Sequence, residues 1–402
     1  MIQSLKYHIN PAKIFSWCIV IFLCSGLIKS FFKFIGANIF YDITAITGLL
    51  IIGLVFILNK GIQRKHLTAF YLLFSLTTWI LFTSTYSSSD EYFLIKLLKF
   101  GQIWVSFLSG YFIISMGLER YFFIRMVVIS TILGILYTFG IIYAALSRGE
   151  WGEIIASYLE VSLLCSFSLT ALIVFNKSIF KTPLLIFLIF TCATILLGNG
   201  ARGGIIFTTL SLLAYALTNT KNLKNILFGV TVVTILTILG YIYSPEIKLL
   251  FDRSFFRLSF FFGVDKGDSI TDRFELISFT IDKVAQSPIF GYGFGSFSEE
   301  YIGVDGRYYP HNIFLEILFE LGLIGLVFFA LFLLTLFIRL DLKKAACYVI
   351  LALPPFFNSL KSLELTEHRL LFFCFGLFLC LSNNKIISYN KLILKPKTKK
   401  YN

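Results

Sequence analysis

Residues 308–326, YYPHNIFLEILFELGLIGL, set the class of fold expected for this chain. After His311 and Asn312 begins an apolar run long enough to cross, as a helix, a hydrocarbon core about 30 Å thick. The run also holds two carboxylates, Glu316 and Glu320. Polar side chains are costly against lipid, so a histidine, an amide and two acids at the start of a membrane span require a protein or water environment.

The composition of the whole chain is that of a membrane protein. Of its 402 residues, 57% are hydrophobic and 14% are charged. The mean hydropathy is +0.84. Such a chain has too few polar side chains to cover the surface of a water-soluble globule, so we expect an all-α integral membrane protein.

Apolar segments near span length recur twelve times along the sequence. Roughly 17 to 25 apolar residues form a membrane-spanning helix, and the shorter segments would borrow flanking residues to reach that length. The predicted spans are residues 14–28, 42–58, 67–83, 93–117, 126–146, 158–175, 183–198, 205–218, 226–243, 313–338, 345–358 and 369–382. The first span follows a polar leader and has no convincing small-residue cleavage site, so we expect it to be retained.

Basic residues gather in the connections on one predicted side of the membrane. The amino terminus, NKGIQRKH, LERYFFIR, NKSIFKT, NTKNLKN, RLDLKK and the carboxy-terminal tail hold more than half of the 35 Lys and Arg, with Glu119 and Asp341 the only acids. Cytoplasmic loops are enriched in Lys and Arg, which predicts cytoplasmic amino and carboxy termini. The net charge of +13 then reflects topology. The basic residues lie in short loops and do not form a basic groove with interspersed aromatic residues, so the sequence does not favour a nucleic-acid partner.

The cysteines and histidines do not have the spacing of a metal site. The sequence has no CxxC, HxxxH or HExxH, and its four histidines are scattered. We expect the seven cysteines to be small packing residues inside or beside spans, without disulfides. They are Cys18, Cys24, Cys165, Cys192, Cys347, Cys374 and Cys380.

One connection is long and differs in charge from the others. Residues 244–312 hold ten Asp or Glu and seven Lys or Arg, and the predicted topology places them outside the cytoplasm. A loop of this length is usually functional. The predicted organisation is nine spans in 1–243, this outer loop in 244–312, three spans in 313–382 and a basic tail in 383–402.

Two amphipathic helices are predicted in the outer loop. Within residues 244–263, apolar positions recur every three or four residues, as in a helix that lies along a membrane interface. A second helix is predicted within 268–288, with Ser269 or Thr271 as its N-cap. Its apolar set is Phe274, Ile277, Ile281 and Val284.

Two arginines are candidate ligand-binding residues. Arg273 is expected in the first turn of the second loop helix, where free backbone N–H groups favour an anion beside it; the alternative is an exposed arginine paired with Asp272 or Asp268. Arg202 lies in GNGARGG (198–204), at the outer end of the seventh span. A guanidinium so close to lipid needs a partner, which can be a ligand, a lipid headgroup or an acid.

The glycines of PIFGYGFGSF (288–297) are a weak motif. No β-strand precedes them and no dinucleotide-binding helix follows, so a turn that joins two loop helices is the better interpretation.

The polar residues of the opening stretch have helical spacing. Asn312, Glu316 and Glu320 recur every four residues and therefore share one face of the tenth span. Each acid is either functional or a buried carboxylate bonded to another helix. His311, whose ordinary pKa is about 6.5, is suited to proton transfer at the membrane surface, although a lone histidine can equally be structural.

Three ordered segments resemble one family of membrane proteins. GNGARGG (198–204), DRFELISFTIDKVAQSPIFGYGFGSF (272–297) and HNIFLEILFELGLIGL (311–326) are similar to the O-antigen ligase and O-antigen polymerase superfamily of bacterial envelope glycan enzymes. Together with the sequence between them, they cover about a third of the chain. The resemblance implies a GT-C-like helical architecture in the bacterial inner membrane, with a periplasmic active site.

The resemblance also implies a reaction and the residues for it. It implies inverting, metal-independent transfer of a glycan from undecaprenyl diphosphate to an acceptor hydroxyl, with no cofactor. Arg202 and Arg273 would bind the diphosphate, and His311 would assist attack by the acceptor, with Asn312 and Glu316 as possible supporting residues. Arginine forks can neutralise a diphosphate leaving group by bidentate hydrogen bonds.

Three functions remain open on the sequence. A polymerase would use a second lipid-linked repeat unit as acceptor, and a ligase would use lipid A-core. The style of the 311–326 segment favours a polymerase by association only. A lipid-linked oligosaccharide transporter is less favoured, because the chain has no internal repeat and its outer charge is concentrated in one loop.

Overall fold

The structure is a computed structural model, and every regular element in the part of the chain it describes is helical. It describes residues 11–34, 42–58, 61–146, 158–175, 181–199, 201–218, 268–338 and 340–381, with isolated positions between 235 and 252. The predicted loop helix at 244–263 and the predicted span at 226–243 lie outside the described residues, apart from those isolated positions. So does the basic tail.

The helices follow the predicted spans closely. They are α1 (Pro11–Leu23), α2 (Ser25–Phe34), α3 (Ile43–Leu58), α4 (Leu67–Thr83), α5 (Glu91–Ser115), α6 (Glu119–Leu146), α8 (Tyr158–Phe175), α9 (Thr182–Gly198), α10 (Arg202–Thr218), α13 (Asp268–Val284), α14 (Phe297–Ile302), α15 (Ile313–Ile338), α16 (Leu342–Ser359) and α17 (Arg369–Leu381). Short 3₁₀ turns are η1 (Arg64–His66) and η4 (Leu365–Glu367). Hydropathy locates these helices because lipid selects the same apolar runs that are counted in the sequence.

Several helices have the length and apolar character of membrane spans. Among the described residues, five pass this test: α4 with η1, α5, α6, α8 and α15. The bent pair α1 and α2, with axes 59° apart, would make a sixth. The bend between α1 and α2 falls within the span predicted at 14–28. Helices α3, α9, α10, α16 and α17 are shorter and apolar, so the number of membrane crossings remains a prediction.

The outer surface of the helices is apolar. Phe56 of α3 and Leu98 of α5 are each 78% exposed, and Leu217 of α10 is 73% exposed. Such bulky apolar side chains on the outside of the bundle are compatible with lipid and would be unfavourable in water. This surface and the span-length helices indicate a multi-pass membrane protein.

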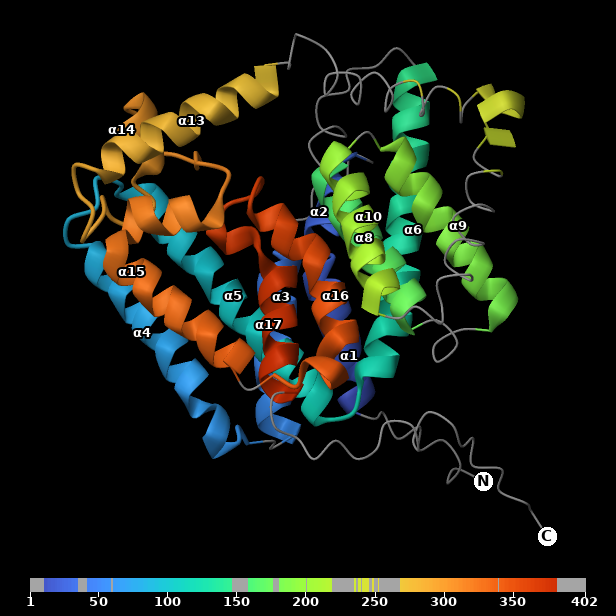
Figure 1. Cartoon of the computed structure of the whole chain (residues 1–402), viewed down its shortest axis with the longest axis horizontal. Coiled ribbons are helices and arrows are strands. Elements are labelled where there is room, and N and C mark those ends of the chain that lie inside the picture. Colours follow the sequence, from blue (N-terminus) through green and yellow to red (C-terminus); the bar gives the residue numbers. More distant parts are fainter. Residues whose placement is uncertain are drawn as a thin grey trace, which may run out of the picture.

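The centre of the bundle is a close crossing of α5 and α17 (Figure 1). A Cβ atom at Gly110 would collide with the carbonyl oxygen of Phe373, and one at Gly376 would collide with that of Phe107. Glycines on both helices let the two backbones touch, as small residues do in many membrane proteins. All seven cysteines are free and six are buried, which confirms that they are packing residues.

Helix α15 is broken, which the sequence did not predict. Gly322 has φ 64° and ψ −167°, and the segments on either side run in different directions (Figure 1). The 288–293 loop fills the break: the amides of Tyr292 and Gly293 donate to the carbonyls of Phe319 and Glu320, both at 2.9 Å. On the other side, the amide of Leu323 donates to Pro288 at 2.9 Å.

The predicted glycine turn therefore has a second role. It joins α13 to α14 as expected, and its glycines at 291, 293 and 295 all have positive φ. A Cβ at Gly291 would lie 2.6 Å from the amide nitrogen of Gly322. The glycine motif is thus the backbone partner of the break in α15.

Candidate active site

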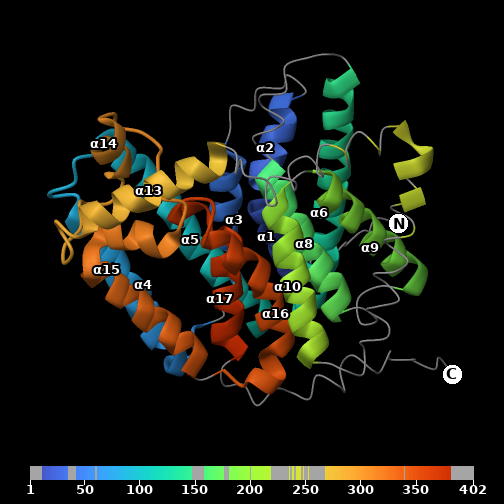
Figure 2. The same ribbon diagram turned by 45° about the horizontal axis from the view of Figure 1, so that its top comes forward.

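The predicted site residues gather at one end of the bundle. Helices α13 and α14 lie over the end where α5 and α15 begin (Figure 1), and a second view shows the same arrangement (Figure 2). The segment 360–368, which we call the α16–α17 connector, lies at this end between α15 and the start of α10. Three predicted residues, Arg202, His311 and Arg273, belong to three different elements around it.

His311 precedes α15 in an unusual backbone conformation. Its φ is 57°, and its ring packs on Tyr309 with centroids 4.5 Å apart. Among the described residues, its buried Nδ1 has no hydrogen-bond partner. Burial and the positive charges of Arg273, Arg307 and Lys361 lower the pKa of His311 to about 4. The imidazole is therefore neutral at physiological pH and able to accept a proton.

Asn312 caps α15 and ties it to the connector. Its Oδ1 accepts hydrogen bonds from the amides of Phe314 at 3.0 Å and Leu315 at 3.2 Å. Its Nδ2 donates to the carbonyl of Leu360 at 3.2 Å. This N-cap satisfies free amides of the helix start, so the contacts assign Asn312 a positioning role beside His311.

Arg202 is the first residue of α10, and the glycines that follow it make room for two polar side chains. A Cβ at Gly203 would overlap the ammonium of Lys361, and a Cβ at Gly204 would overlap the hydroxyl of Ser162. Arg202 is half-buried. The ARGG turn therefore brings the Arg202 guanidinium and the Lys361 ammonium together at the start of α10.

Arg273 does not occupy the helix position that was predicted. Helix α13 already includes Asp268, so Arg273 is at least in its second turn and neither Ser269 nor Thr271 is the N-cap. The expectation of an arginine at the helix end was wrong because the helix begins earlier than its apolar pattern. Arg273 is half-buried, and its charge acts on both His311 and Lys361.

The face of α13 that packs on the protein also differs from the predicted apolar set. Leu276 is 2% exposed and packs with Phe297 and Phe319, whereas Phe274 is 62% and Ile281 is 56% exposed. The helix thus has apolar side chains on two sides. The outward side is suited to lipid, as expected for a helix at a membrane interface.

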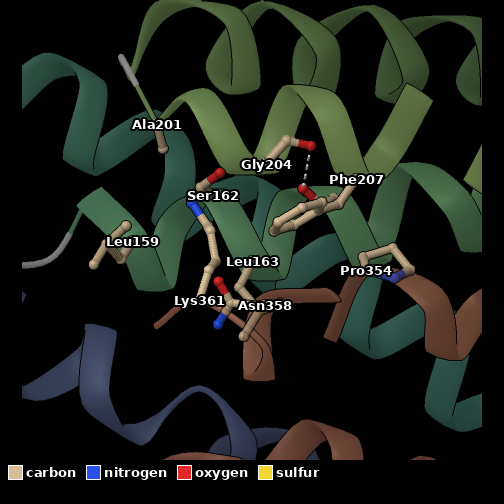
Figure 3. A pocket seen from close by; sticks show the side chains of 10 residues that line it. Leu159, Ser162, Leu163, Ala201, Gly204, Phe207, Pro354, Asn358 and Lys361 are labelled. Atoms are coloured by element: carbon tan, nitrogen blue, oxygen red, sulfur yellow. Dashed lines mark hydrogen bonds between the residues drawn. The ribbon is translucent and has the colours of Figure 1, made fainter. Parts of the chain in front are cut away.

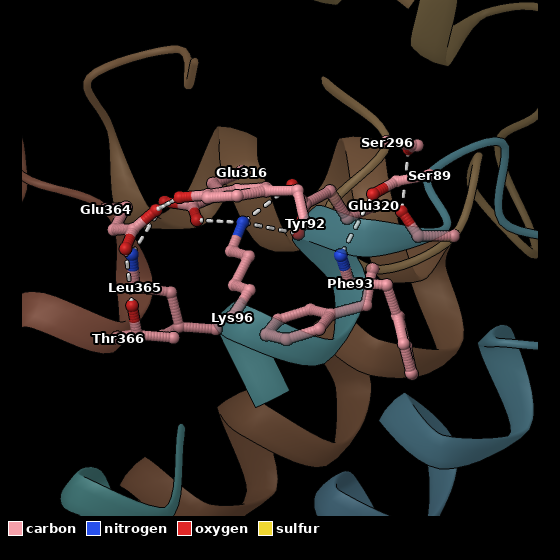
Figure 4. A network of polar contacts seen from close by, with 12 residues as sticks. Ser89, Tyr92, Phe93, Lys96, Ser296, Glu316, Glu320, Glu364, Leu365 and Thr366 are labelled. Atoms are coloured by element: carbon pink, nitrogen blue, oxygen red, sulfur yellow. Dashed lines mark hydrogen bonds and ion pairs between the residues drawn. The ribbon is translucent and has the colours of Figure 1, made fainter. Parts of the chain in front are cut away.

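Glu316 and Glu320 form a buried ion cluster with a lysine of α5 (Figure 4). The Nζ of Lys96 lies 2.7 Å from a carboxylate oxygen of each acid, and all three side chains are at most 1% exposed. Of the two interpretations left open, a buried acid bonded to another helix describes both carboxylates. Glu316 also accepts the amide of Leu365 at 2.8 Å, so it fixes the connector.

A third acid joins this network from the connector itself. Glu364 accepts a hydrogen bond from the hydroxyl of Tyr92 and lies 3.1 Å from the Nζ of Lys99. Although burial opposes it, the charges of Lys96 and Lys99 help to hold the pKa of Glu364 at about 2. Glu364 is thus ionised across the physiological range, and the connector is fastened to α5.

The segment before His311 is fastened to the same elements. Arg307 donates to both carboxylate oxygens of Glu367 at 2.7 Å. Asp305 accepts the amides of Asp90 at 3.1 Å and Glu91 at 2.8 Å, and so caps the start of α5. His311 is therefore held between two anchored segments.

Lys361 is the principal site residue that the sequence analysis missed. It is half-buried, and burial together with the charges of Arg273 and Arg202 lowers its pKa to about 8. Its sequence context, NSLKSLELTEH (358–368), is that of an ordinary loop. Only the closeness of Gly203 reveals its position. Lys96 was missed for a related reason, because a single lysine in an apolar span gives no indication of its partner.

Metal-ligating side chains do not cluster in this site. No group of three or more His, Cys, Asp or Glu suited to a metal ion occurs in the part of the chain that the structure describes.

The fold and the site define a multi-pass helical membrane protein that places several cations and one neutral histidine at one end of its bundle. Residues 187–330 match the family model described as O-antigen ligase, which confirms the predicted resemblance to the O-antigen ligase and polymerase superfamily. The matched region contains Arg202, Arg273 and His311 and excludes the α16–α17 connector. No curated protein sequence matches the chain.

Proposed function

We propose that the chain is a polysaccharide polymerase that transfers a glycan from undecaprenyl diphosphate to a sugar hydroxyl of a second lipid-linked repeat unit. Members of the superfamily are glycosyltransferase-like enzymes of O-antigen processing. The observation that carries the proposal is the convergence of positive charge on His311: Arg273 and Lys361 both act on it, and Arg202 acts on Lys361.

The proposed chemistry is a single displacement. The acceptor oxygen forms a bond to the anomeric carbon from the face opposite the diphosphate, and the carbon–oxygen bond to the diphosphate breaks with its electron pair. One displacement inverts the anomeric configuration. Arg202 and Arg273 neutralise the charge that develops on the diphosphate, a role for which preorganised guanidinium groups are well suited and which needs no divalent cation.

His311 accepts the proton that the acceptor hydroxyl loses. In the absence of ligand, burial and its cationic neighbours together keep the imidazole neutral. A bound diphosphate would offset those charges and make the imidazole a stronger base as the donor arrives. The same cations would therefore serve both binding and general-base catalysis.

We also propose a cellular localisation, a membrane topology and a domain organisation for the chain. Twelve spans in a GT-C-like architecture would cross the bacterial inner membrane, with both termini cytoplasmic and the active site periplasmic. The catalytic loop would be 244–312, between nine spans in 1–243 and three in 313–382, followed by the basic tail 383–402. Among the described residues, the basic residues of η1 and of the start of α6 lie at the end opposite His311 and support this orientation.

Alanine substitutions test the residue roles. Arg202→Ala, Arg273→Ala and His311→Ala should each lower glycan product by about 10² to 10³-fold at normal protein level. Arg120→Ala is the matched control, because Arg120 is exposed and lies in the first turn of α6, at the opposite end of the bundle. Normal product from any of the three site variants would refute the role given to that residue.

A ligase is the second candidate, since the matched family model is described as O-antigen ligase. A ligase would use lipid A-core as its acceptor. A deletion strain separates the two: a polymerase mutant lacks long lipid-linked polymer, whereas a ligase mutant accumulates that polymer and lacks it on lipid A-core. Accumulation of the polymer would contradict the polymerase assignment.

A further inference from the structure

A small polar pocket lies beneath the first turn of α10, at the edge of the proposed site (Figure 3). It is bounded by α8, α10, the end of α16 and the connector. Its polar lining comes from Ser162, Ser166, Asn358 and Lys361, and Phe207 forms part of its apolar wall. Lys361 and Ser162 come together across this space in Figure 3.

Lys361 has cations as its charged neighbours. The charges that act on it are those of Arg202 and Arg273. Within the described ranges, no acid lies within ion-pair distance of its Nζ, and its cation–π contact is with Phe207, 5.2 Å from ammonium to ring centroid. Because the Lys361 ammonium is partly buried and close to two other cations, an anion bound to it would stabilise it.

Ser162 is a second, independent indication of a ligand. It is 3% exposed and lines the pocket, and its Oγ has no hydrogen-bond partner among the residues the structure describes. Its neighbour Ser166 is already engaged, because its hydroxyl donates to the carbonyl of Gly204 at 3.2 Å. A buried hydroxyl without a partner is costly, and a ligand oxygen in the pocket would supply one.

The backbone around Lys361 is held in an unfavourable conformation. Leu363, two residues further on, has φ 69°, a value that non-glycine residues rarely adopt. The buried contacts of Glu364 and Glu316 hold the connector in place. Strained backbone that is fixed by its surroundings tends to mark functional sites, because it presents a side chain in one position.

We propose that Lys361 and Ser162 form a third phosphate-binding element, which holds an oxygen of the same diphosphate group that Arg202 and Arg273 bind. The ligand class is a diphosphate ester, and the inference rests on the proposed function. Gly203 is also required for this element, because a side chain at that position would block the Lys361 ammonium from the start of α10.

Binding of inorganic pyrophosphate to the purified full-length protein tests the inference without turnover. Lys361→Gln should weaken the Kd by about 10- to 100-fold, the range expected for one charged hydrogen-bonding partner. Lys361→Arg should retain most of the affinity, and Ser162→Ala should lose less than Lys361→Gln. The control is Lys65→Gln, an exposed lysine at the other end of the bundle.

Substitution of Gly203 tests whether the position of the Lys361 ammonium matters as well as its charge. Gly203→Ala keeps Lys361 but adds a Cβ where the ammonium lies, so it should weaken pyrophosphate binding as well. Gly101→Ala is the matched control, because a Cβ there meets nothing within 4 Å in helix α5. Thermal unfolding of each variant reports whether the chain is folded.

The outcomes separate this inference from the proposed function. If Arg202→Ala weakens pyrophosphate binding and Lys361→Gln does not, only the inference fails; if neither changes binding, the diphosphate site fails as well. Undecaprenyl diphosphate in nanodiscs should displace pyrophosphate at a far lower mole fraction than phosphatidylglycerol does. Equal displacement by the two lipids would assign the pocket to phospholipid headgroups and overturn the inference.

Discussion

Two non-glycine residues in the described part of the chain have left-handed backbone, and both lie in segments next to the cations Arg202, Arg273 and Lys361. They are His311, with φ 57°, and Leu363, with φ 69°. Such positions cost about 1 to 3 kcal/mol each and persist only where the surroundings fix them. Here the surroundings are the Asn312 cap on one side and the Glu364 contacts on the other. The two strained backbone positions therefore belong to the segments that bring His311 and Lys361 close enough for the Lys361 charge to act on His311.

At the residue scale, Lys361 gives the site a pH dependence on the alkaline side. Its pKa of about 8 means that the ammonium is fully charged below that value and is lost as the pH rises through it. The groups that face it are Arg202 from α10, Arg273 from α13 and His311 before α15, and the pKa of His311 lies well below that of Lys361. Pyrophosphate affinity should therefore fall above about pH 8.

Lys361→Arg is the control for this dependence, because a guanidinium keeps its charge throughout that range. Titration of pyrophosphate itself is common to both proteins. The difference in log Kd between the parent and Lys361→Arg should grow as the pH rises from 7 to 9.5. A constant difference would show that Lys361 does not bind the anion as an ammonium.

Some of the candidate site residues could be predicted from the sequence, and others could not. Arg202 and His311 stand out because charged or titratable side chains are rare at the threshold of apolar runs. Lys361 does not stand out, since a lysine in a polar loop is ordinary. Its importance depends on contact with Gly203, which lies 158 positions earlier in the chain. No local sequence pattern encodes a contact between such distant residues.

At the element scale, the buried ion cluster should be costly to break from one side. Lys96→Met leaves Glu316 and Glu320 without their shared cation and should destabilise the protein by about 3 to 5 kcal/mol. Adding Glu320→Gln to Lys96→Met should restore part of the loss. Thermal unfolding in detergent measures both, with the exposed Lys65→Met as control. Equal stability of Lys96→Met and Lys65→Met would contradict the assigned role.

The break in α15 should depend on its glycine. Gly322 has φ 64° and ψ −167°, which essentially only glycine adopts, and a Cβ there would overlap the carbonyl of Ile289. Gly322→Ala should therefore cost at least about 2 kcal/mol of stability, whereas Gly53→Ala, whose Cβ meets nothing within 4 Å, should cost none. The midpoints of thermal unfolding compare the two. Equal midpoints would mean that the break is not needed.

Helix positions were predictable and this break was not. A helix in lipid requires a long apolar run, which hydropathy detects directly. A single glycine inside such a run is usually tolerated, so Gly322 carries no signal by itself. What stabilises the break is the loop at 288–293, whose amides and carbonyls replace the missing helical bonds. That pairing is tertiary, so no local pattern predicts it.

At the scale of the whole molecule, we predict that the end of the bundle that carries His311 faces the periplasm. Val304, 60% exposed, lies at the site end, and Gln63, also exposed, lies at the opposite end. A membrane-impermeant thiol reagent should label Val304→Cys in cells with a permeabilised outer membrane, and should label Gln63→Cys only after lysis. The reverse pattern would invert the proposed topology.

The central claim is direct transfer of a glycan from a polyprenyl diphosphate at the site formed by Arg202, Arg273 and His311. The most direct measurement is reconstitution of the purified chain with undecaprenyl-diphosphate-linked repeat units, without an energy source and with a chelator present. We predict lengthened lipid-linked glycan, released undecaprenyl diphosphate and an inverted linkage, all strongly reduced in His311→Ala. Repeat units that stay unextended with the parent protein, or product unchanged in His311→Ala, would contradict the account.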